Sequence, residues 1–170
     1  MQFNDVIDSR YSVRKYSSKP VEEEKLKRIL EAGRLAPTAR NMQGQHIYVV
    51  RSPEQRKKFS KDWAMTFDAP IVLIISMKHE LEWISHFSKK NRGETDAAII
   101  TDEMMLQAHA LGLGTCWVGW FDPEEVKKAF DLPDDETVYN LLPLGYPADD
   151  CKPGPMHGSR KPLEETVTFL

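Results

Sequence analysis

An uninterrupted apolar run, Ile71-Val72-Leu73-Ile74-Ile75, constrains the fold more than any other feature of this sequence. Its aliphatic and β-branched residues favour a strand, and because successive side chains of a strand point to opposite faces, both faces of this strand are apolar. Such a strand belongs at the centre of a sheet with helices covering both sides. The run is far shorter than the ~20 apolar residues needed to cross a bilayer, so we expect a layered domain without a membrane span.

Runs of β-branched and aliphatic residues predict strands at 46–51, 70–76, 115–119 and 138–145. Shorter helical patterns predict helices at 3–8, 53–61 and 123–130. Two longer helices are predicted at 22–35 and 95–111, the second of them apolar nearly all round and therefore buried. We expect Thr95 to cap this helix and Gly112 to follow its end in the left-handed conformation. Residues 164–170 alternate like a strand after a loop rich in proline and glycine, so they could pair with another subunit.

The charge balance and the cysteines narrow the class of protein. The 170 residues carry a net charge of −3 with a pI of about 6.0, which gives no global attraction to nucleic acid or to an anionic membrane. The N-terminus lacks a secretory signal, and Cys116 and Cys151 form no CxxC motif, so we expect a cytoplasmic protein with free thiols. A single domain of this size has a genuine core but is near the lower limit for enclosing a large cofactor by itself.

Two arginines flank a serine near the N-terminus, in Arg10-Tyr11-Ser12-Val13-Arg14. In an extended segment, residues 10, 12 and 14 share one face. Two guanidinium groups around a hydroxyl suit a phosphate monoester, which binds charge-assisted donors from converging directions. A solvated charge patch at a helix end is the other interpretation, and the pattern by itself favours it.

The loop Pro37-Thr38-Ala39-Arg40-Asn41-Met42-Gln43 lies between a predicted helix and a predicted strand and is rich in side chains that donate and accept hydrogen bonds. Carbonyl acceptors flank an N–H donor along the pyrimidine edge of a flavin, and the amides of Asn41 and Gln43 would match them. Ordinary turn chemistry, in which Asn and Thr bond their own backbone, explains the same residues and is favoured by the pattern alone.

A glycine-containing segment, residues 112–120, differs from a dinucleotide fingerprint because it runs from a helix into a strand. A Rossmann dehydrogenase is therefore not expected. Gly119 could let a backbone N–H approach a planar ligand, with Trp117 or Trp120 as an aromatic wall. A structural glycine and core tryptophans are the alternative, which the pattern alone favours. Near the C-terminus, Arg160 could bring a further cation to a phosphate, although exposed basic residues usually serve solubility.

Other chemistries find less support in the sequence. His79 and His86 share one face of a helix, but no second ligand pair completes a metal site. Cys116 lies in an apolar strand that disfavours its thiolate, which makes it a poor nucleophile. The sequence contains neither the GxSxG motif of many hydrolases nor the phosphate-binding loop of nucleotide triphosphatases.

Taken in their order along the chain, these segments resemble the nitroreductase family of FMN-dependent oxidoreductases. The resemblance spans about residues 5–167 and rests on Arg-x-Ser-x-Arg, Ala-Pro-Thr-x-x-Asn-x-Gln, Gly-Leu-Gly before Thr-Cys-Trp-Val-Gly, Leu-Pro-Leu-Gly-Tyr-Pro and Arg-Lys-Pro-Leu-Glu-Glu. It implies an α+β fold with a central, mostly antiparallel sheet flanked by helices, in a domain-swapped homodimer. Residues 1–150 would form the FMN-binding domain, and residues 151–170 would form an arm exchanged with the partner subunit.

The resemblance also implies a set of cofactor-binding residues, and no catalytic side chain or metal. The backbone near Gly119 would face flavin N5, and the loop at 37–43 would arrive from the other subunit. The implied residues are Arg10, Tyr11, Ser12, Arg14, Pro37, Thr38, Asn41, Gln43, Trp117, Val118, Gly119, Leu144, Gly145 and Arg160.

The implied activity is a ping-pong reaction in which NAD(P)H delivers hydride to the flavin and a nitroaromatic, quinone or similar small acceptor then takes its place. A non-catalytic flavin-binding or redox-sensing module is one alternative, and a specialised relative acting on flavin or halogenated substrates is another. The segment at 78–94 is short, whereas larger relatives insert helices there that cover the flavin. We therefore expect a more exposed flavin face than in those relatives.

Overall fold

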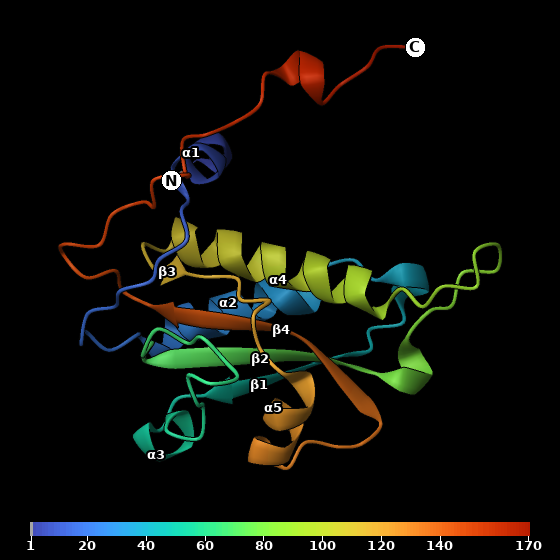
Figure 1. The fold of residues 1–170 in the computed structure, drawn as a ribbon, viewed down its shortest axis with the longest axis horizontal. Helices are drawn as coiled ribbons and strands as arrows, with labels where there is room; N and C mark the ends of the chain where they lie inside the picture. The colour runs from blue at the N-terminus through green and yellow to red at the C-terminus, as the bar shows by residue number, and fades with distance from the viewer. Residues whose placement is uncertain (1) are drawn as a thin grey trace.

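The computed structural model describes residues 2–170 and contains one four-stranded antiparallel sheet (Figure 1). The strand order is β1-β2-β4-β3. The strands are β1 (Gln45–Val50), β2 (Ile71–Lys78), β3 (Gly114–Thr115) and β4 (Glu136–Gly145). The predicted α+β class with an antiparallel sheet and flanking helices is thereby confirmed.

The apolar run lies in β2, which pairs with β1 on one side and with β4 on the other. Seven of the eight residues of β2 are buried. Ile71, Leu73 and Ile75 point into one core, whereas Val72 and Ile74 point into a second core on the opposite face. The predicted central strand with two apolar faces is confirmed.

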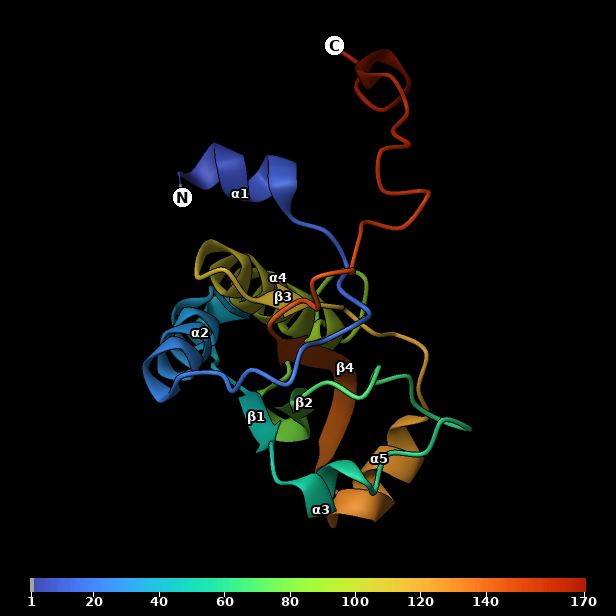
Figure 2. The same cartoon turned by 90° about the vertical axis from the view of Figure 1, so that its left-hand side faces the viewer.

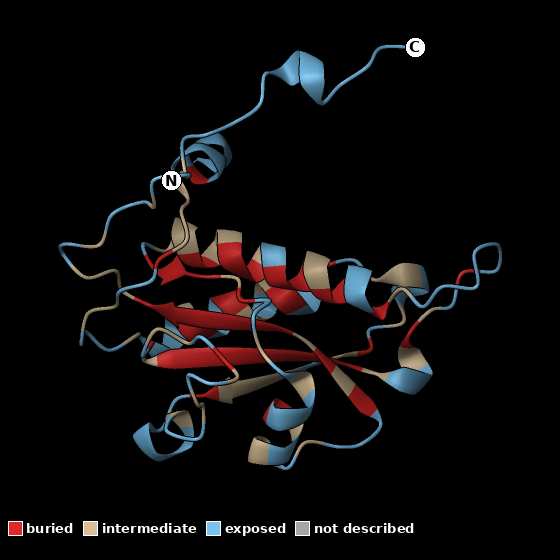
Figure 3. Cartoon of the chain, viewed as in Figure 1, coloured by how far each residue is buried: buried red, intermediate tan, exposed pale blue. Residues whose placement is uncertain are grey.

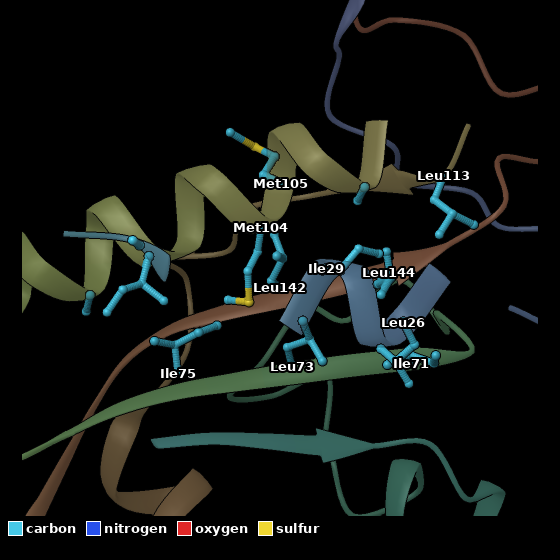
Figure 4. Packing of buried hydrophobic residues seen from close by; sticks show 14 of the residues in the cluster. Leu26, Ile29, Ile71, Leu73, Ile75, Met104, Met105, Leu113, Leu142 and Leu144 are labelled. Carbon is cyan, nitrogen blue, oxygen red and sulfur yellow. The ribbon is translucent and has the colours of Figure 1, made fainter. Parts of the chain in front are cut away.

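Helices cover both faces of the sheet and form three layers with it (Figure 2). The face with the larger core carries α2 (Glu23–Leu35) and α4 (Gly93–Ala110), whose side chains interlock with those of β2 and β4 (Figure 4). The other face is covered by α3 (Pro53–Arg56) and α5 (Pro123–Phe130). The short α1 (Phe3–Ser9) lies beyond α4.

Most predicted helices form, but two of their limits differ from the prediction. α4 begins at Gly93 rather than after Thr95, because the side-chain oxygen of Asn91 accepts a hydrogen bond from the Gly93 N–H at 2.7 Å. Gly112 follows its end with φ +77°, as expected. The helix predicted at 53–61 ends at Arg56 and continues only as turns.

The strand predicted at 115–119 is regular only at Gly114–Thr115. Its register continues, since the Cys116 N–H donates to the Pro143 carbonyl and Val118 bridges to Leu141. Pro143 stands opposite Cys116 and has no N–H to return, so the ladder is broken at that pair. Residues 79–81 form a 3₁₀ turn, so the predicted helical face of His79 and His86 is absent from this described segment.

The C-terminal segment leaves the body of the domain and ends in an exposed extension (Figure 3). Residues 161–170 are all exposed, and the strand predicted at 164–170 is instead the 3₁₀ turn η3 (Leu163–Glu165) followed by irregular backbone. A strand needs a neighbour for its backbone groups, and this extension has none within the described residues. Among residues 2–170, no helix has the length and apolarity required to cross a membrane.

Candidate functional site

The segment with the two arginines runs extended along the end of β3. Ser12 forms a parallel bridge with Thr115, and the Val13 N–H donates to the Thr115 carbonyl at 2.8 Å. The Val13 side chain is 1% exposed and fills the space that a Cβ on Gly114 would need, 2.4 Å from Val13 Cγ2. Because Val13 points inward, its neighbours Ser12 and Arg14 point outward, as the alternation predicts.

Arg10, Ser12 and Arg14 all influence the pKa of the neighbouring Cys116 thiol. Burial raises the pKa of the Cys116 thiol, while the charge of Arg14, a hydrogen bond from Ser12 and the charge of Arg10 oppose that rise. The disfavoured thiolate is therefore confirmed. Within residues 2–170, neither arginine has a carboxylate within 4.0 Å, so their positive charge is not neutralised.

The segment that pairs with Ser12 at Thr115 continues to Gly119, which has free space around it. Gly119 is exposed, and a Cβ built on it would meet no atom within 4 Å. In the described part of the chain its N–H has no hydrogen-bond partner. Trp120 is 57% exposed beside it, whereas Trp117 packs on the larger core and donates to Asn140 Oδ1 at 2.8 Å. Trp120 is thus the more accessible of the two predicted aromatic walls, and the indole N–H of Trp117 is already bonded within the chain.

The other predicted positions near Gly119 can offer only their backbone to a ligand. Val118 and Leu144 are 5% and 0% exposed, and both side chains belong to the cores. Gly145 lies under Pro70 and Tyr16, where a Cβ would be 2.6 Å from Pro70 Cγ. Glycine is needed at position 145 because neighbouring segments approach so closely.

The loop at 37–43 is anchored by one buried carboxylate. The Ala39 N–H donates to both oxygens of Asp96, at 3.0 and 3.1 Å, and Asp96 is 3% exposed. Burial raises the pKa of Asp96, and the hydrogen bond from Ala39 opposes that rise. Thr38 Oγ1 accepts from the Gln43 N–H at 3.0 Å, which is the turn chemistry described above.

Three residues of this loop adopt the left-handed conformation. Arg40, Asn41 and Gln43 have φ of 54°, 56° and 51°. Non-glycine residues adopt this conformation at an energetic cost and keep it where the surrounding structure fixes them. The loop therefore presents the exposed side chains of Asn41 and Gln43 in a fixed backbone frame, next to exposed Pro37.

The two predicted parts of the site lie at opposite ends of α4 (Figure 1). Ser9 directly precedes Arg10, and its Oγ lies 2.8 Å from Nε2 of His109 at the C-terminal end of the helix. At its N-terminal end, Asp96 holds Ala39. A helix rises 1.5 Å per residue, so the two ends are about 20 Å apart. One chain does not bring Arg10, Ser12 and Arg14 together with the loop at 37–43.

Tyr11 contacts the C-terminal segment, which also contains Arg160. The Tyr11 hydroxyl donates to the Cys151 carbonyl at 3.5 Å, and its ring meets His157 edge-on. Arg160 is exposed and its guanidinium donates to the Ser159 carbonyl at 2.8 Å. The part of Arg160 in a phosphate site stays a prediction.

A cavity of about 970 Å³, which the sequence patterns do not identify, adjoins both Arg14 and Trp120. Its further lining includes Arg56, Lys57 and Lys61. The basic run at 56–58 is the sequence pattern that could have indicated this cavity. Only the folded loop shows that Arg56 and Lys57 line it and that Lys58 does not. Within residues 2–170, no group of three or more His, Cys, Asp or Glu side chains is arranged to hold a metal ion.

Comparisons with known proteins show which proteins this chain resembles. Residues 7–64 and 61–146 match the model of the nitroreductase family. A solved structure of a nitroreductase family protein from Clostridium difficile 630 superposes with a TM-score of 0.92 at 35% identity, covering 99% of this chain and 98% of that one. An NADH dehydrogenase of Thermus thermophilus is 30% identical over 94% of this chain and 92% of its own length. An FMN reductase (NAD(P)H) of Bacillus subtilis is 30% identical over 86% of this chain and 67% of its own.

Proposed function

This chain belongs to the nitroreductase family of oxidoreductases, and from that premise we propose that it is an FMN-dependent enzyme that takes hydride from NAD(P)H and reduces nitroaromatic, quinone or similar small acceptors. The names of the relatives support the cofactor and the donor, since one is an FMN reductase (NAD(P)H) and another an NADH dehydrogenase.

The observation that carries the proposal is the strand segment with unneutralised cations at one end and an open glycine at the other. Arg10 and Arg14, with Ser12 between them, offer charge-assisted donors of the kind that a phosphate binds. Gly119 offers an unpaired N–H and free space where the flat ring of a flavin could lie. The donor set therefore fits FMN, with its phosphate at the arginines and its ring at Gly119.

The rest of the site would come from a second copy of the chain. The amides of Asn41 and Gln43 suit the pyrimidine edge of a flavin, but they are about 20 Å from Arg10 along α4. In a homodimer, the loop at 37–43 of each subunit would complete the site of the other. The arm beyond Cys151 is mostly exposed in the single chain and would contact that partner.

Bound FMN would supply the redox chemistry, accepting hydride and passing electrons on. The side chains would bind and orient it. Donors from Asn41 and Gln43 would stabilise the negative charge that reduction places on the pyrimidine carbonyls, and the Gly119 N–H would help to orient the ring at N5. Trp120 would limit access to the ring from one side.

The visible spectrum of the purified protein tests this proposal. We expect a yellow protein that releases FMN on denaturation, bleaches anaerobically with NADH or NADPH, and regains its colour when a nitroaromatic or quinone is added. A colourless protein that does not bind added FMN would overturn the proposal. A yellow protein that is never bleached would replace it with a non-catalytic flavin-binding role.

A further inference from the structure

A hairpin at 83–92 projects beyond the N-terminal end of α4 (Figure 1). At its base, the Arg92 N–H donates to the Trp83 carbonyl at 2.9 Å. Closer to the tip, the Ser85 N–H donates to the Lys90 carbonyl, also at 2.9 Å. The hairpin's own backbone bonds therefore define its shape, although it stands away from the rest of the domain.

The tip of this hairpin is aromatic and positively charged. Phe87 is 95% exposed, and its ring lies edge-on to that of His86 with the centroids 5.5 Å apart. Lys89 and Lys90 follow and are also exposed. Within residues 2–170, neither lysine has a carboxylate within 4.0 Å. The tip thus offers a flat apolar surface beside two charges that the chain does not neutralise.

The base of the hairpin is fixed to the body of the domain by Glu82. This residue is 7% exposed and accepts hydrogen bonds from the Tyr139 hydroxyl, at 2.9 Å, and from the Asn91 amide. A Cβ on Gly93, the first residue of α4, would lie 2.5 Å from Glu82 Cδ. Glycine at position 93 therefore allows the start of the helix to approach the base of the hairpin closely.

The hairpin lies at the same end of the domain as the loop at 37–43. A Cβ on Gly44, just after that loop, would lie 2.8 Å from Leu81 Cβ. The Gly44 carbonyl also accepts from the Lys78 N–H at 2.9 Å. Asp96, which anchors the loop, is in the first turn of α4, directly after the hairpin. A partner subunit that receives the loop would therefore receive the hairpin with it.

We propose that the tip of the hairpin at 83–92 lies over the flavin of the partner subunit and selects planar aromatic acceptors that carry a negative charge. The inference rests on the proposed function, in which the loop at 37–43 reaches that flavin. Phe87 would stack on the ring of the acceptor. Lys89 and Lys90 would attract its carboxylate or sulfonate group and would give a neutral acceptor no advantage.

Binding of 4-nitrobenzoate to the FMN-loaded protein, followed by the flavin absorption spectrum without any hydride donor, tests the charge selection. We expect its Kd to rise about tenfold in Lys89→Gln/Lys90→Gln, because two attractive charges are lost. The Kd of 4-nitrobenzamide, which has a similar shape and no charge, should not change. Lys27→Gln/Arg28→Gln removes two charges from consecutive exposed residues of α2 and, as the matched control, should leave both Kd values unaltered.

Phe87→Ala tests the stacking role of the tip. We expect it to raise the Kd of 4-nitrobenzoate and of 4-nitrobenzamide by the same factor, about fivefold, because both compounds lose the same ring contact. Phe87→Tyr keeps a flat ring and should retain the wild-type values. Equal Kd values for the wild type and Phe87→Ala would remove Phe87 from the acceptor site.

Other outcomes separate this proposal from the function on which it rests. An unchanged Kd for 4-nitrobenzoate in the lysine variant, or an equal rise for 4-nitrobenzamide, would overturn the charge selection. FMN-loaded wild-type protein that binds neither compound would overturn the whole assignment. If 4-nitrobenzoate binds with the expected charge dependence but NADH and NADPH never bleach the flavin, the proposed function is wrong and the assignment of the tip stands.

A mixed dimer shows whose flavin the tip serves. One chain carries Arg14→Ala, and the other carries Lys89→Gln with Lys90→Gln. At an FMN concentration that fills only the site with an intact Arg14, the flavin is held by the lysine-variant chain and faces the wild-type hairpin of its partner. We expect wild-type affinity for 4-nitrobenzoate. The weaker affinity of the lysine-variant homodimer would show that the tip serves its own subunit, which would overturn the proposal.

Discussion

Residues 10–14 and residues 37–43 lie at opposite ends of α4 and are held by different means. The first segment pairs with β3 and is pinned by the buried side chain of Val13, which leaves its cations free. The second is anchored by Asp96 and contains three left-handed residues. One region is thus a strand edge that carries charge, and the other is a strained loop that carries amides. Neither offers what the other provides, which is why we expect two chains to build each site.

Arg14→Ala should have the largest effect, because it removes a charged donor from the strand-edge region and leaves the loop intact. We expect FMN affinity to fall by about 1.5–3 kcal/mol, the range for a hydrogen bond to a charged group. Fluorescence titration of the apoprotein with FMN measures this. Arg28→Ala makes the same charge change at an exposed position of α2 and should leave the affinity unaltered. Equal affinities for the two variants would remove Arg14 from the site.

Asp96→Ala should have a smaller effect, directed at the loop. It leaves the Ala39 N–H without its acceptor, and we expect the free energy of unfolding to fall by about 1–2 kcal/mol. FMN binding should weaken as well, because the loop loses its anchor. Asp96→Asn keeps one oxygen that accepts from Ala39 and should retain most of both properties. The anchoring role of Asp96 would be wrong if the Ala and Asn variants behaved alike in chemical denaturation and FMN titration.

The smallest effect concerns Glu136 at the start of β4, which is 1% exposed. Burial alone would raise its pKa, but hydrogen bonds from Ser76, His46 and Tyr48 together hold the pKa of Glu136 below its ordinary value of 4.5. A carboxyl with a lowered folded-state pKa stabilises the fold above its unfolded pKa, and this contribution is lost as pH falls through the folded value.

Unfolding midpoints in urea should therefore drop as the pH falls below 4.5. Glu136→Gln should flatten this dependence, because the amide does not titrate. Glu54→Gln, at an exposed position, should leave it as in the wild type. A pH profile of Glu136→Gln that parallels the wild type would show that another group is responsible.

The sequence predicts best where one local pattern decides the structure. The apolar run specifies β2 as a central strand, and the proline and acidic residues at 123–125 place the start of α5. It predicts less well where a residue outside the local pattern intervenes. Pro143 interrupts the pairing of residues 115–119, and Asn91 starts α4 earlier than Thr95.

The candidate site shows the same division. The alternation of Arg10, Ser12 and Arg14 is a local property and is confirmed by the inward Val13. The anchoring of the 37–43 loop by Asp96 joins residues that are 57 positions apart, and no short pattern indicates it. The cationic cavity likewise depends on how the loop at 57–70 folds back against Trp120.

A mixed dimer gives the most direct test of the claim that two chains share each flavin site. One chain carries Arg14→Ala, and the other carries Asn41→Gly with Gln43→Gly, which removes the amides while glycine accepts the left-handed backbone. Different affinity tags allow the mixed dimer to be purified. In it, one site receives both defects and the other receives none.

We predict that each homodimer of variants binds FMN weakly, whereas the mixed dimer binds about one FMN per dimer with wild-type affinity, as two-fold symmetric sharing requires. A mixed dimer that binds FMN no better than the two variant homodimers would contradict the account, because each chain would then form its site alone.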